Sequence, residues 1–213
     1  MSDTPFRKAI KDILNITAPL FLVFAVVIGL TIGGCGKKKD ETDKLLEQME
    51  QHKAAQDANT AEAARLGPDV LGLLGVQQAI AANGIPLNKL FLFDSFYTPV
   101  STKFVFDNIA SDIFDATKTG PIYSAEQYDC DDEALSAMVI ARRSYYGRTG
   151  EKRSVAILFG EFHYHRATGG RHAINCFITK DGNGHKLEFF EPQTWKLVQL
   201  TPEEIRSCTF CRF

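Results

Sequence analysis

The chain has 213 residues, with 24 basic and 26 acidic side chains and a formal net charge of −2. This near balance argues against a protein held to nucleic acid by charge alone, because neutralising phosphates requires a concentrated basic surface. A hydrophobic content of 45% with 16 phenylalanines excludes a generally disordered chain. The cysteines number five, and this odd count indicates separate roles for separate thiols instead of a disulfide framework.

Residues 1–35 are typical of a targeting or anchoring segment. No charged residue lies between Asp12 and Lys37, and three basic residues precede this apolar stretch. The stretch ends in the sequence IGGC, which resembles the lipobox of bacterial lipoproteins and makes Cys35 the predicted lipidation site. An uncleaved transmembrane helix and a buried soluble helix are the alternatives. The lipoprotein and the transmembrane-helix interpretations both predict a membrane-anchored protein that faces the extracytoplasmic side, as in a bacterial or phage-encoded envelope lipoprotein.

Residues 36–66 are predicted to form a charged helical tether. Alanine, glutamate, glutamine and lysine predominate there, and these residues favour a helix. The apolar positions are too few to bury much surface, so the tether is expected to be solvated, as a helix or a partly disordered spacer. A weak coiled-coil seam is the alternative. The remaining residues, 67–213, are enough for one domain with its own core.

Within this domain the spacing of apolar residues changes from a helical to a strand period. The expected elements are helices over 69–82 and 130–146, an extended or irregular segment over 90–106, and strands over 154–165, 172–180 and 186–190. The sequence DGNG at 181–184 is expected to join the last two strands in a hairpin. A helix followed by antiparallel strands predicts an α+β fold.

Cys130 lies at the start of the second predicted helix, in the sequence YDCDD. A thiol at a helix N-terminus faces unpaired N–H groups and the positive end of the dipole, which lower its pKa and favour the nucleophilic thiolate. Such a nucleophile needs a base and a group that orients the base. His172 begins one predicted strand and Glu191 follows the next, so a hairpin can bring them side by side. The chain order Cys130, His172, Glu191 is that of a papain-like peptidase.

The motifs around these three residues resemble the papain-like cysteine protease domain of the Marasmius oreades agglutinin family, over roughly residues 85–205. The resemblance implies a papain-like fold, with Cys130 as nucleophile, His172 as general base and then acid, and Glu191 as the residue that fixes the imidazole tautomer. The residues expected to support this site, in the oxyanion hole or behind the triad, are Gln127 and Gln193. The best-known family member carries a sugar-binding β-trefoil before the protease domain. This chain has an anchor and a tether there, so the resemblance implies no glycan targeting.

The same resemblance implies a calcium requirement. The candidate ligands are Asp129, Asp131 and Asp132, with Glu133 beside them, because hard cations bind carboxylate oxygens. A bound cation would also offset the repulsion that these acids exert on a Cys130 thiolate. The alternative interpretation is that they are solvated acids that suit the helix dipole.

The leading hypothesis is therefore a membrane-tethered cysteine hydrolase that cleaves amide bonds outside the cytoplasm, in proteins or in cell-wall peptides. One alternative is a non-catalytic anchored binding module of the same fold. The other is a metalloprotein with histidine and cysteine ligands, and its candidate ligands are His163, His165, His172 and Cys176. No nucleic-acid partner is expected.

The remaining cysteines and the single tryptophan are expected to serve structure. Cys176 is predicted to be a small core residue. Cys208 and Cys211 form a lone C-x-x-C, for which a local disulfide or two free thiols are expected. Trp195, just after the Glu191 motif, is expected to pack against neighbouring side chains.

Overall fold

The computed structural model describes residues 37–117, 129–150, 155–182 and 184–213. Cys35 and Gln127 therefore lie outside the described residues. The chain divides into two compact units, one ending at Asp57 and the other running from Ala58 to Phe213. In the part of the chain that the structure describes, no helix has both the length and the apolar character needed to span a membrane.

The polar stretch forms one helix, α3 (Lys37–Leu66), as its helix-favouring composition predicts. Leu45 and Leu46 are exposed on it. The end of α3, including Asn59, belongs to the second unit and bonds within it. The Asn59 Oδ1 accepts a hydrogen bond from the Leu73 N–H at 3.0 Å, and its Nδ2 donates to the Ser95 carbonyl at 3.4 Å.

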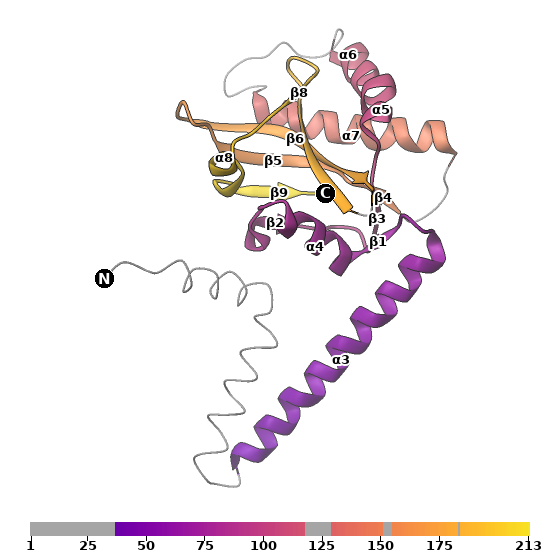
Figure 1. The fold of residues 1–213 in the computed structure, drawn as a ribbon, viewed down its shortest axis with the longest axis vertical. Helices are drawn as coiled ribbons and strands as arrows, with labels where there is room; N and C mark the ends of the chain where they lie inside the picture. The colour runs from indigo at the N-terminus through magenta and orange to yellow at the C-terminus, as the bar shows by residue number, and fades with distance from the viewer. Residues whose placement is uncertain (1–36, 118–128, 151–154, 183) are drawn as a thin grey trace. The chain divides into compact units, whose positions relative to one another are not determined.

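A six-stranded sheet forms the centre of the second unit (Figure 1). Its strands are, in spatial order, β2 (Leu90–Phe91), β9 (Phe210–Arg212), β5 (Phe159–His165), β6 (Arg171–Asp181), β7 (Gly184–Glu191) and β8 (Lys196–Val198). All neighbours are antiparallel except β2 and β9, which are parallel. The hairpin expected at 181–184 is present, with Asp181 paired to Gly184.

A smaller sheet lies beside it, formed by β1 (Leu71–Gly72), β3 (Phe96–Thr98) and β4 (Ala156–Ile157). β1 and β3 are antiparallel, whereas β3 and β4 are parallel. The strand expected over 154–165 is thus divided, because β4 pairs with β3 while β5 enters the large sheet.

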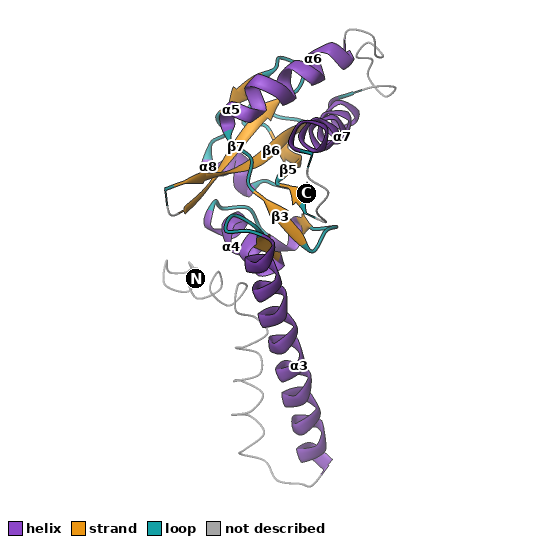
Figure 2. Ribbon diagram, turned by 90° about the vertical axis from the view of Figure 1, so that its right-hand side faces the viewer, coloured by secondary structure: helices purple, strands orange, loops and turns teal. Residues whose placement is uncertain are grey.

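Helices cover both faces of the large sheet. On one face lie α7 (Cys130–Thr149), α5 (Thr102–Phe104), a π-helical turn (Val105–Ala110) and α6 (Ser111–Thr117), which Figure 2 shows together on one side. This face buries the first core, which includes Ile109, Phe159, Phe177 and Phe190. On the other face lie α4 (Leu73–Ala82) and α8 (Pro202–Arg206), and a 3-10 turn (Leu87–Lys89) follows α4. This face buries the second core, which includes Ile80, Phe162, Ile174 and Leu187.

Local signals explain where the main helices begin and end. The Asp129 side chain caps α7 by accepting from the Asp131 N–H at 3.3 Å, and Gly150 ends it with a φ of 62°. Thr201 and Glu204 form a capping box at α8. Asn83 ends α4 and holds it to the sheet. The Asn83 Nδ2 donates to the His185 carbonyl at 3.1 Å, and its Oδ1 accepts from the Leu187 N–H at 3.1 Å.

The predicted α+β class is confirmed, whereas the papain-like arrangement is not. The first helix begins at Leu73 instead of residue 69, because Asp69 forms an ion pair with Lys180 and Gly72 precedes the helix. The segment expected to be extended over 90–106 turns helical at Thr102, where the Ser101 side chain caps α5. The sequence patterns did not indicate β8, β9 or α8.

Candidate ligand-binding site

Cys130 occupies the first turn of α7, where the sequence placed it, and its thiol is half-buried. Burial raises the pKa of this thiol, and the charges of Asp129 and Asp131 raise it further. A hydrogen bond from the Ala173 N–H acts in the opposite direction but does not prevail. The lowered pKa expected from the helix dipole is therefore wrong, because the neighbouring carboxylates and desolvation outweigh the dipole.

His172 and Glu191 come together at the start of β6 and the end of β7. The His172 Nε2 lies 2.7 Å from the Glu191 Oε2, and the histidine is buried. The other carboxylate oxygen of Glu191 accepts from the Gln193 N–H at 3.3 Å. The hairpin thus places the two residues side by side, as the sequence predicted.

Cys130 reaches the start of β6 from α7, because its thiol accepts a hydrogen bond from the N–H of Ala173, the residue that follows His172. Asn175 faces α7, because its Nδ2 donates to the Ala134 carbonyl at 2.7 Å. Side chains alternate along a strand, so His172 points to the other face, where its ring lies 5.9 Å from that of Tyr164. Among the described residues no hydrogen bond joins Cys130 to His172.

Glu133, in the first turn of α7, extends the polar cluster toward the β7–β8 turn. Burial raises the pKa of its carboxyl group, although a hydrogen bond with the Gln193 side chain lowers it. The Glu133 Oε2 is buried and has no hydrogen-bond partner among the described residues. Gln193 therefore contacts both Glu133 and Glu191, and it belongs to this cluster as expected.

The predicted calcium ligands are only partly brought together. One ligand atom from each of Asp129, Cys130 and Asp131 lies within 4.8 Å of the others, and Asp132 is outside this group. A hydrogen bond between Asp129 and Asp131 lowers the pKa of the first and raises that of the second. Calcium binding stays a prediction.

We expect Cys130 to alkylate slowly at neutral pH. Its raised pKa leaves little thiolate, which is the reacting species, so iodoacetamide should react several-fold more slowly than with free cysteine. Cys176, Cys208 and Cys211 are buried and should be labelled only after unfolding. Peptide mass spectrometry at pH 7 and pH 9.5 measures each thiol. Faster labelling of Cys130 than of free cysteine at pH 7 would contradict the raised pKa.

The histidines proposed as metal ligands do not converge. His163 pairs with buried Glu161, and His165 is exposed. In the described ranges, no group of three or more histidine, cysteine or acidic ligands includes them or His172. The predicted core position of Cys176 is confirmed, with its Sγ 3.8 Å from that of Cys211.

Cys208 and Cys211 are free thiols, and burial raises the pKa of Cys208 to about 12. Trp195 packs edge-on against Phe114, with ring centroids 4.7 Å apart, as expected. Its φ of 56° is unusual for a bulky side chain and fixes the turn between β7 and β8.

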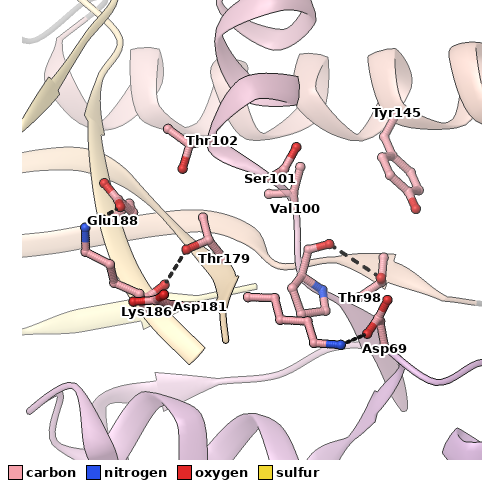
Figure 3. A pocket seen from close by; sticks show the side chains of 12 residues that line it. Asp69, Thr98, Val100, Ser101, Thr102, Tyr145, Thr179, Asp181, Lys186 and Glu188 are labelled. Atoms are coloured by element: carbon pink, nitrogen blue, oxygen red, sulfur yellow. Dashed lines mark hydrogen bonds and ion pairs between the residues drawn. The ribbon is translucent and has the colours of Figure 1, made fainter. Parts of the chain in front are cut away.

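A polar pocket of about 690 Å³ lies in the second unit, and Cys130 is not among the residues that line it (Figure 3). It is lined by Asp69, Thr98, Pro99, Val100, Ser101, Thr102, Tyr145, Thr179, Lys180, Asp181, Lys186 and Glu188. These residues come from separate segments that only the folded chain assembles. The sequence did not predict this pocket, because no local motif marks it and the apolar spacing places Asp69 at the start of a helix.

Ion pairs and hydroxyl groups dominate the pocket wall. Lys180 pairs with Asp69 at 2.5 Å, and Lys186 pairs with Glu188 at 2.7 Å. The Thr179 hydroxyl donates to the Lys186 carbonyl at 3.4 Å. Figure 3 shows the Tyr145 ring on the same side as Asp69 and across the pocket from Lys186 and Glu188. The pocket therefore combines several polar groups with one aromatic face.

Solved structures that share this fold include the following two. One is of a protein named PSL1a, and the other is of the Polyporus squamosus lectin. The structure described as a PSL1a–E64 complex has a TM-score of 0.53 and 22% identity, over 68% of this chain and 50% of that one. The lectin bound to the human-type influenza-binding epitope Neu5Acα2-6Galβ1-4GlcNAc has a TM-score of 0.52 and 22% identity, with the same coverage. This chain thus spans half the length of either. No family model matches the chain, and no curated protein matches it.

This comparison corrects the identification as a papain-like cysteine peptidase. One of the structures is described as a lectin, and neither description names a peptidase. The predicted function as a thiol hydrolase is contradicted. The comparison also gives no support for a protein, peptide or cell-wall substrate, or for a membrane-anchored enzyme. The raised pKa of the Cys130 thiol agrees with this correction.

Proposed function

We propose that the unit from Ala58 to Phe213 is a non-catalytic binding module that holds a carbohydrate in the pocket of Figure 3. The observation that carries the proposal is the polar pocket of about 690 Å³, a size in the usual range for small-ligand sites. The lectin neighbour bound to a trisaccharide epitope supports the choice of ligand class. Because this chain matches half of that lectin, its specificity is not carried over.

The chemistry of the wall suits a sugar. A saccharide presents many hydroxyl groups, each of which donates one hydrogen bond and accepts others. Ser101 and Thr102 can provide the same two functions, and the carboxylates of the pocket accept. The apolar face of a pyranose ring can rest on Tyr145, whose ring is amphipathic. Each direct hydrogen bond would contribute about 0.5–1.5 kcal/mol.

Binding of Galβ1-4GlcNAc by the full chain tests the proposal. We expect Thr102→Val, which removes one hydroxyl without changing the side-chain shape, to weaken binding about two- to tenfold. Tyr145→Ala should weaken it further. Arg206→Gln, on the exposed surface of α8, is the matched control and should bind like the parent. Isothermal titration measures the affinities, and thermal unfolding checks that the variants remain folded.

Two results would contradict the proposal. The first is equal binding by the parent and both pocket variants, which would place the sugar elsewhere. The second concerns E64, the compound named with PSL1a. A mass increase of one E64 molecule on the full chain, lost in Cys130→Ser, would place a ligand at Cys130. That outcome would assign the binding site to the cluster of Cys130, His172 and Glu191.

A further inference from the structure

We infer that the pocket accepts neutral or amine-bearing sugars and excludes sugars that carry a carboxylate. This inference rests on the proposed function. It concerns the charge of the ligand, and the charged residues of the pocket wall carry it. These residues are Asp69, Lys180, Asp181, Lys186 and Glu188.

Both lysines in the wall are already paired. The Lys180 Nζ lies 2.5 Å from an Asp69 oxygen, and the Lys186 Nζ lies 2.7 Å from a Glu188 oxygen. The hydrogen bond to Glu188 raises the pKa of Lys186, and the charge of Asp181 acts in the same direction. Among the residues that the structure describes, no other cationic side chain lines the pocket, so both of these cations already have an acidic partner.

Asp181 differs from Asp69 and Glu188, because its charge acts on Lys186 without a direct ion pair. It lies at the end of β6 and is exposed, and it forms no ion pair with any described residue. With three acidic and two basic side chains, the wall has a net charge of −1. An amine on a sugar would therefore meet an acceptor that carries a full charge, and charge-assisted hydrogen bonds are the stronger ones.

A ligand carboxylate would be disfavoured for two reasons. It would be repelled by Asp181, because like charges at short range cost free energy. It could still bond to Lys180 or Lys186, but each lysine already shares its charge with Asp69 or Glu188, so its attraction for a second carboxylate is reduced. Discrimination of this kind comes from a repulsive group in the site as much as from attractive ones.

The consequence is a ligand class that differs from the epitope bound by the lectin neighbour, which ends in the acidic sugar Neu5Ac. The hydroxyl groups of the pocket alone would not distinguish neutral from acidic sugars, because a hydroxyl group both donates and accepts hydrogen bonds. The unpaired Asp181 carboxylate provides the distinction.

Matched saccharides test the inference on the full chain. We expect Galβ1-4GlcNAc to bind at least about fivefold more tightly than Neu5Acα2-6Galβ1-4GlcNAc, since one unfavourable contact of about 1 kcal/mol corresponds to this ratio. A chitosan disaccharide with free amines should bind more tightly than its N-acetylated form. Asp181→Asn should remove both preferences. The control Asp107→Asn, on the π-helical turn and outside the pocket, should keep them. Tighter binding of the sialylated sugar by the parent would overturn the inference.

Small charged probes keep this test separate from the proposed function. If no saccharide binds, the proposed function fails, and the charge preference is then measured with ethanolamine and glycolate. We expect ethanolamine to shift the amide resonances of Lys180, Asp181 and Lys186, and these shifts should be lost in Asp181→Asn. Larger shifts with glycolate would overturn the inference whether or not a sugar binds.

Discussion

Replacing Gly160 by alanine is expected to destabilise the domain by at least about 3 kcal/mol, because a side chain has no room there. Gly160 lies in β5, and a Cβ built on it would be 2.0 Å from the Arg212 carbonyl oxygen and 2.7 Å from the Phe213 ring. The closest contact is backbone of the adjacent strand β9, which cannot move aside as a flexible side chain can. Urea unfolding of the full chain, followed by tryptophan fluorescence, measures the change in the free energy of unfolding.

The matched control for this prediction is Gly147→Ala in α7. No atom lies within 4 Å of a Cβ built on Gly147, so the substitution creates no clash. Alanine has the higher helix propensity, and we expect a stabilisation of about 0.5–1 kcal/mol. Equal stability of the two variants would contradict the close packing of β5 against β9.

Replacing Glu161 by alanine is expected to cost about 3–5 kcal/mol, because it breaks a buried charge network. Glu161 is only 3% exposed. One of its carboxylate oxygens accepts from the Arg212 Nε at 2.7 Å and lies 2.6 Å from a second guanidinium nitrogen, and the other bonds to His163. Without the carboxylate, Arg212 would be left partly buried and unpaired. Glu62→Ala, on α3, is the control and should leave stability nearly unchanged, because its ion pair with Arg65 lies at the surface.

The same network makes stability depend on pH. Burial acts to raise the pKa of Glu161, but the hydrogen bond and charge of His163, together with Arg212, outweigh burial and lower it. A carboxyl group with a lowered pKa stabilises the folded state above its unfolded value of 4.5, and this contribution is lost as the pH falls through the folded value. We expect a steeper loss of stability below about pH 4.5 in the parent than in Glu161→Gln. The free energy of unfolding is measured for both proteins at pH 7 and pH 3.5. An equal loss of stability in the two proteins between these pH values would contradict this assignment.

The elements that depend on local sequence could be predicted. The start of α7 at Cys130 follows from the Asp129 cap and the helical spacing that comes after it. The β6–β7 hairpin follows from its turn sequence, and the hairpin alone is enough to place His172 beside Glu191. Each of these features is decided by residues close together in the chain.

The features that depend on long-range pairing could not be predicted. β2 and β9 have two and three residues, and they pair in parallel across more than half the chain. Strands this short have too few residues to show an alternating pattern. The pocket likewise joins Asp69 to Lys180, and only the tertiary fold brings these two residues together.

The relation between Cys130 and His172 is a third case. The sequence correctly places one residue at a helix start and the other at a strand start. It does not show which face of the sheet each residue will occupy, because that depends on the register of β6 beneath α7. The Asn175 bond to α7 fixes the register and assigns His172 to the opposite face.

The bonds made by Asn83 connect the two faces of the sheet mechanically. This side chain, at the end of α4, bonds to the backbone of His185 and Leu187, the two residues on either side of Lys186. Leu187 faces the core beneath α4, whereas Lys186 lines the pocket on the other face. Any tilt of α4 would therefore shift the backbone that carries a charged group of the pocket wall. A contact made on the α4 surface could in this way alter ligand affinity through the thickness of the sheet.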